Sequence, residues 1–138
     1  MQRLFEICVN FLEWIGNTFH ITYQQISVYI NLYLQGGLLV LSAIPALIVA
    51  IIHKSPIWIV ATALNAAVYV LGFIWMMVHY NLPQNINYAF DKCVDDLMIL
   101  AQSWHLSYQQ VNLLIFVLGF LLLLGLNLGL CGILKTCR

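Results

Sequence analysis

Three long stretches of this 138-residue sequence contain no charged residue: 26–52, 57–78 and 111–134. Each exceeds the roughly 18–20 apolar residues that a helix needs to cross the hydrocarbon core of a bilayer. Only 7% of the residues are charged and 63% are hydrophobic. A soluble domain is about one quarter charged. The sequence therefore predicts an all-α integral membrane protein with three transmembrane helices, folded as a single membrane domain over residues 1–138.

The sequence also matches itself at an offset of 85 residues. HITYQQI at 20–26 returns as HLSYQQV at 105–111. The match extends over 5–26 and 90–111, where the identical pairs are Phe5/Phe90, Cys8/Cys93, Val9/Val94, Leu12/Leu97, His20/His105, Tyr23/Tyr108, Gln24/Gln109 and Gln25/Gln110. Such self-similarity predicts a repeated structural unit. We expect repeat unit one at 3–52, repeat unit two at 88–135, and a connecting transmembrane helix at 57–80 that has no repeat partner.

Each predicted unit begins with an amphipathic segment. In 3–18 and the residue that follows, the apolar residues at helical spacing are Phe5, Cys8, Leu12, Ile15 and Phe19, opposite Arg3, Glu6, Asn10, Glu13 and Asn17. In 88–103 and the residue that follows, they are Phe90, Cys93, Val94, Leu97, Ala101 and Trp104, opposite Asp91, Asp95 and Gln102. This pattern predicts two interfacial helices. Transmembrane helices near 23–52 and 108–134 follow them.

The joint between the two parts of each unit has the composition of a capping box. Thr22 and Gln25 are three residues apart, as are Ser107 and Gln110. In such a box the hydroxyl accepts a hydrogen bond from the third backbone N–H of the helix, and the glutamine side chain reaches back to the cap. Capping accounts for the repeated heptad without any catalytic role, so we interpret it as a hinge of fixed angle.

The stretch LSYQQVNLLIF at 106–116 resembles the start of the membrane helix in small uncharacterised membrane proteins of Bacteroidota. This resemblance implies a bacterial inner membrane. It implies no activity, and no functional residues carry over from it.

The repeat predicts the topology. With one connecting helix between them, the two units are parallel, and both interfacial helices lie on the side of the N-terminus. That side contains two basic and five acidic residues: Arg3, Lys92, Glu6, Glu13, Asp91, Asp95 and Asp96. The other side contains Lys54, Lys135 and Arg138 without an acid. The positive-inside rule then predicts a cytoplasmic C-terminus, with the N-terminus and the interfacial helices outside.

Polar residues within the spans form two groups. Ser42, Asn65 and Asn127 come to a similar depth, ~12 Å from the Lys54 side for Asn65, and so predict an intramembrane polar layer supplied once by each helix. Small residues flank this layer, including the close-packing pair Gly125 and Gly129. The second group is a polar stripe on the first span: Gln24, Ser27, Asn31 and Gln35. We favour a stripe that faces protein over one that lines an aqueous path, because polar membrane residues commonly bond neighbouring helices.

The sequence gives little sign of chemistry. His20, His79 and His105 fall on the N-terminal side and would suit a transition metal or a pH sensor, but no ligand pair has local motif spacing, and helix-end roles explain them. Neither a Ser/His/Asp set nor a carboxylate pair is recognisable, so we expect no enzyme and no cofactor. Zero net charge and the lack of a basic tail argue against nucleic acid as a partner.

Two functions remain open. The first is a small accessory or assembly subunit of a larger membrane protein complex, which acts by helix packing in the lipid bilayer and by docking of its interfacial helices on other membrane protein subunits. The alternative is a homo-oligomeric channel or pore, in which the polar stripe of the first span lines the lumen. An enzyme or haem carrier has poor support, because His53 and His79 leave the membrane on opposite sides.

Overall fold

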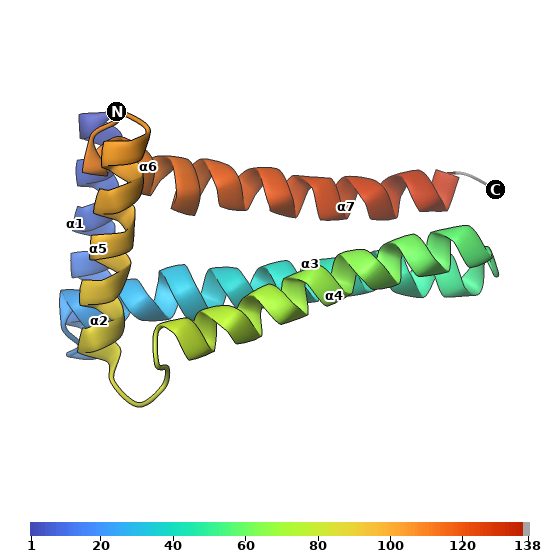
Figure 1. Ribbon diagram of the computed structural model, residues 1–138, viewed down its shortest axis with the longest axis horizontal. Coiled ribbons are helices and arrows are strands. Elements are labelled where there is room, and N and C mark those ends of the chain that lie inside the picture. Colours follow the sequence, from blue (N-terminus) through green and yellow to red (C-terminus); the bar gives the residue numbers. More distant parts are fainter. Residues whose placement is uncertain (137–138) are drawn as a thin grey trace.

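The computed structural model describes residues 1–136, and every element there is helical (Figure 1). The elements are α1 (Gln2–Phe19), α2 (Tyr23–Val28), the π-helical segment η1 (Tyr29–Leu34), α3 (Gln35–Ile52), α4 (Pro56–His79), α5 (Ile86–Ser103), α6 (Tyr108–Leu113), the π-helical segment η2 (Leu114–Gly119) and α7 (Phe120–Thr136). Arg138, which contributes to the predicted orientation, lies outside the described residues.

Three helices are long and apolar enough to span a membrane. They are Tyr23–Ile52, formed by α2, η1 and α3; Pro56–His79, formed by α4; and Tyr108–Thr136, formed by α6, η2 and α7. At about 1.5 Å per residue, even α4 exceeds the ~30 Å of a hydrocarbon core. The prediction of an all-helical fold with three helices able to span a membrane is therefore confirmed.

The three spans lie alongside one another, with α3 packed against both α4 and α7 (Figure 1). The first and third spans run in the same direction, and α4 runs in the opposite direction. Helices α1 and α5 cross one end of the spans, where the N-terminus also lies, and the chain leaves α7 at the other end. This arrangement has the topology expected for two parallel units separated by one connecting helix.

The elements before and after α4 correspond in kind and position. Both α2 and η1 begin and end 85 residues before α6 and η2, respectively. Each outer span therefore contains a six-residue π-helical segment at the same place. A π-helix closes i→i+5 hydrogen bonds, so each of its turns takes more residues than an α turn. The sequence pattern did not predict these segments.

Each crossing helix packs against the span of the other half of the chain. The rings of Phe5 in α1 and Tyr108 in α6 lie 6.2 Å apart at 81°, and those of Phe90 in α5 and Tyr23 in α2 lie 6.0 Å apart at 78°. Both are edge-to-face contacts, which aromatic pairs favour. Residues 85 apart thus make the same contact in reverse, so the two halves interlock. The buried apolar side chains repeat in the same way: Leu12, Ile26 and Val28, then Leu97, Val111 and Leu113.

The two joints have the same backbone geometry. His20 and His105 adopt the left-handed conformation, with φ of 56° and 54°. In each joint the N–H of the residue that follows the histidine, Ile21 or Leu106, donates to the carbonyl five residues before it, as in a Schellman motif. Both predicted capping boxes then begin the spans: Thr22 Oγ1 accepts from the N–H of Gln25 at 3.3 Å, and Ser107 Oγ accepts from that of Gln110 at 3.2 Å.

Candidate functional site

The structure brings the three residues of the predicted polar layer together. Asn127 Nδ2 donates to Ser42 Oγ at 2.8 Å, and Asn65 Nδ2 donates to Asn127 Oδ1 at 3.1 Å. Ser42 Oγ in turn donates to the carbonyl of Leu39 at 2.8 Å. Ser42 is 8% exposed and Asn127 only 2%. The three spanning helices are therefore tied by one chain of hydrogen bonds within the membrane.

The layer has a special place in the fold. Ser42 and Asn127 are 85 residues apart and bond each other directly, so they lie where the two halves of the chain meet. Among the described residues, no buried side-chain oxygen or nitrogen lacks a hydrogen-bond partner. A layer of neutral, mutually bonded groups is suited to fixing helix positions, since unpaired polar groups in hydrocarbon are costly.

Gly125 and Gly129 are not part of this packing. Both are exposed, and a Cβ atom added at either would meet no other atom within 4 Å. The expectation that they pack helices around the layer is therefore wrong within the chain. The physical reason is helix phase, because α7 turns a different face, with buried Asn127, Cys131 and Leu134, towards the rest of the protein. The glycines instead lie in an open groove on the outside of α7.

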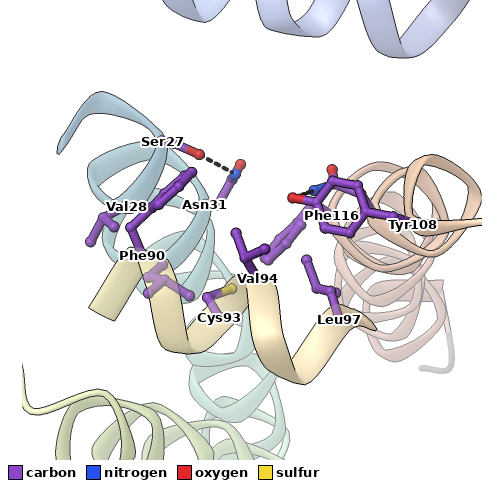
Figure 2. A pocket seen from close by; sticks show the side chains of 11 residues that line it. Ser27, Val28, Asn31, Phe90, Cys93, Val94, Leu97, Tyr108 and Phe116 are labelled. Atoms are coloured by element: carbon purple, nitrogen blue, oxygen red, sulfur yellow. Dashed lines mark hydrogen bonds between the residues drawn. The ribbon is translucent and has the colours of Figure 1, made fainter. Parts of the chain in front are cut away.

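The predicted polar stripe divides into separate environments. Gln24 is exposed, whereas Asn31 Nδ2 donates to Ser27 Oγ at 3.3 Å. Figure 2 shows this pair beside the side chains of α5, with Phe90 and Cys93 closing over it. The pocket between them measures about 20 Å³, room for roughly one water molecule. Gln35 lines a larger crevice between the spans, which Asn31 also borders.

A polar cluster that the sequence did not reveal joins the end of α4 to α5. His79 Nε2 lies 3.0 Å from Asp96 Oδ2, and the hydroxyl of Tyr80 donates to the same oxygen at 3.0 Å. Lys92 Nζ donates to the backbone carbonyl of His79 at 2.8 Å. Carbonyls at a helix C-terminus lack intrahelical partners and attract cations, so Lys92 completes the end of α4. The ring of Trp75 also stacks on His79 at 4.6 Å.

The cluster fixes structure and does not activate a nucleophile. Burial, with a smaller contribution from the nearby Asp96 carboxylate, raises the pKa of the Cys93 thiol to about 11. Burial also raises the pKa of the Tyr80 hydroxyl, to which Cys93 and Asp96 add. Both groups therefore keep their protons at neutral pH, whereas reactive cysteines have a lowered pKa.

The three histidines on this side of the protein lie in separate settings. His20 and His105 are exposed residues of the two joints, and His79 is held by Asp96. Within residues 1–136 there is no group of three His, Cys, Asp or Glu side chains that could hold a metal ion. The local structure explains the joint histidines, because histidine is enriched among residues that adopt a positive φ.

Neither protein-family models, nor curated proteins, nor solved structures gave a match to this chain. The proposals that follow therefore depend on the chain's own geometry.

Proposed function

We propose that this protein is an accessory or assembly subunit of a larger membrane complex. We further propose that it is built from two parallel repeat units, whose helices α1 and α5 lie in the membrane interface. One observation carries the proposal. An offset of 85 residues relates two positions for a further transmembrane helix, and residues 1–136 fill only one of them.

Helix α4 occupies the filled position. It packs along α3, where the ring of Phe73 covers Gly36 so closely that an added Cβ would lie 2.8 Å from it. Its end is held by the neighbouring α5, through Asp96 and Lys92. The filled position therefore has two walls, α3 and α5.

The open position is found by adding 85 to each wall residue of α3 and subtracting 85 from each wall residue of α5. Gly36 becomes Leu121 on α7, while Lys92 and Asp96 become Ile7 and Phe11 on α1. These three residues are 57%, 59% and 56% exposed. The wall that α5 forms at the filled position is thus charged, whereas the corresponding wall that α1 forms at the open position is apolar.

A cavity marks the same place. It measures about 120 Å³ between α1 and η2, and its lining is entirely apolar: Met1, Leu4, Leu113, Leu114, Val117 and Leu118. We propose that one transmembrane helix of a partner subunit lies along α7, antiparallel to it as α4 is to α3. The end of this partner helix beneath α1 is apolar or aromatic, because Ile7 and Phe11 of α1 offer it no charged side chain.

The acidic residues favour the orientation predicted by the positive-inside rule. Glu6 and Glu13 on α1, and Asp91 and Asp95 on α5, are all exposed. Anionic lipids on the cytoplasmic face of a membrane would repel them. We therefore propose a bacterial inner membrane protein with these helices outside. A pore has less support, because Ser27 and Asn31 of the polar stripe bond each other beneath α5.

Native mass spectrometry after gentle detergent extraction tests the proposal. The variant Gly125→Phe fills the open position one turn from Leu121, and the chain itself leaves space there. Leu126→Phe, at an exposed residue roughly 140° around the helix from Leu121 at 3.6 residues per turn, is the matched control. We expect the wild type and Leu126→Phe to carry a heteromeric partner that Gly125→Phe loses. A monomer in all three samples would contradict the proposal, and a homogeneous ring would favour the pore.

A further inference from the structure

A crevice between the two outer spans is a feature that helix packing alone does not explain. It measures about 390 Å³, within the ~300–1,000 Å³ range of small-molecule sites. The first span contributes Asn31 and Gln35, the third contributes Phe116 and Gly119, and Met76 of α4 closes one end. Asn31 and Phe116 also line the small pocket of Figure 2, so the crevice continues towards α5.

Gln35 is a half-buried residue of this crevice. It lies twelve residues into the span that begins at Tyr23, and so ~18 Å along the helix, near the middle of a hydrocarbon core of ~30 Å. Asn31 is already bonded to Ser27, but within residues 1–136 the Gln35 side chain has no hydrogen-bonded partner. An amide in hydrocarbon strongly favours a partner that can accept or donate a hydrogen bond.

The walls provide a second, independent indication. Both π-helical segments of the described chain line the crevice, η1 through Asn31 and Leu32, and η2 through residues 114–116 and 119. π-helical segments occur frequently at functional sites. Gly119 and Gly36 also border the space.

We propose that the crevice binds a neutral, lipid-soluble molecule that presents one carbonyl or hydroxyl group to the Gln35 amide and lays an apolar body along the spans. The lining includes no ionisable side chain, so it offers nothing to a charged group. The depth of Gln35 agrees with this, because phospholipid headgroups stay at the membrane surface. Both a quinone and a neutral acylglycerol have the required chemistry.

Photoactivatable analogues of both molecules test this in the purified full-length protein in nanodiscs, with labelled peptides mapped by mass spectrometry. We expect saturable labelling of 31–39 and 114–123 by the quinone probe or the diacylglycerol probe, and whichever competes better identifies the source. Gln35→Leu should weaken this labelling about three- to tenfold, as expected for one lost hydrogen bond in a membrane. Gln24→Leu removes an exposed amide outside the crevice and should change nothing.

A second variant, Leu123→Trp, narrows the crevice and should also reduce labelling. Both substitutions keep the polar layer intact, and unchanged thermal melting in detergent verifies this for each variant. The proposal is overturned if neither probe labels these segments, if a phospholipid probe labels them equally well, or if Gln35→Leu binds like the wild type. None of these outcomes depends on the partner helix, so the two proposals stand or fall separately.

Discussion

Replacing Asn127 by leucine tests whether the intramembrane layer stabilises the bundle. Leucine has the same number and branching of side-chain heavy atoms as asparagine but cannot form hydrogen bonds. Asn127 donates to Ser42 Oγ and accepts from Asn65 Nδ2, and it makes a longer contact of 3.5 Å with the carbonyl of Leu39, so the variant loses all of these contacts between spans at once. Asn65→Leu is the matched variant, because it loses only one of them and removes the amide itself.

The expected magnitudes follow from these contacts. Hydrogen bonds between membrane helices average about 0.6 kcal/mol, and Asn65→Leu also leaves the buried Oδ1 of Asn127 without its donor. Asn65→Leu should therefore lower the free energy of unfolding by about 1.5 kcal/mol. Asn127→Leu loses two such bonds and also leaves the amide of Asn65 without its partner. An unsatisfied group of this kind costs about 1 kcal/mol or more. We therefore expect Asn127→Leu to destabilise the protein by roughly 2 kcal/mol.

Equilibrium unfolding in mixed detergent micelles measures both values, and the double variant completes a cycle. The double variant lacks the amide of Asn65 and so has no unpaired amide there. The double variant should therefore be no less stable than Asn127→Leu alone. The reasoning is refuted if Asn127→Leu is no less stable than Asn65→Leu, or if the two effects simply add.

Two further predictions concern the joints and the buried thiol. Thr22→Ala and Ser107→Ala should each lower the free energy of unfolding by roughly 1 kcal/mol through loss of a helix cap, and unchanged thermal stability of both variants in detergent would show that the caps contribute nothing. The Cys93 thiol has a pKa of about 11 in the folded protein, above the ordinary value of 9.0. The contribution of this thiol to stability is therefore complete below pH 9 and is lost as the pH rises towards 11. In a variant without the other cysteines, maleimide should label Cys93 slowly at pH 8. Labelling at the rate of a free cysteine would disprove its burial.

Much of the fold is legible in the sequence because the membrane imposes simple rules. Uninterrupted apolar stretches give the spans, since a charged residue in hydrocarbon is costly. The polar layer also follows from counting, because Ser42 and Asn127 occupy the same depth at an offset of 85 residues. Capping is a local interaction, so the spacing of Thr22 with Gln25 and of Ser107 with Gln110 predicts the capping boxes directly.

What the sequence conceals depends on phase and on contacts between distant segments. No proline or glycine marks Tyr29–Leu34 as π-helical, so the sequence does not reveal that the helix phase changes between Ser27 and Gln35. The contact of His79 with Asp96 requires the loop after α4 to return α5 across the helix end. One signal was present: Asp91 and Asp95 belong to the polar face of α5, and Asp96 lies beyond it.

A motif of small residues has a related ambiguity. Gly125 and Gly129 indicate that a helix can approach α7 closely, but the motif does not say which helix. The structure leaves both glycines open, so the neighbour inside the chain was the wrong assignment.

Exposure of apolar side chains does not by itself identify a partner surface in this protein. In water such a stripe would mark an interface, but lipid tails solvate it as well as another helix does. The informative observation is a difference between two positions that the same offset relates. Lys92 and Asp96 meet the end of α4, whereas Ile7 and Phe11 occupy the same places on α1 and are 59% and 56% exposed. If only lipid covers α7, Gly125→Phe and Leu126→Phe should have the same effect on complex formation. If a partner helix fills the open position, only Gly125→Phe should disrupt the complex.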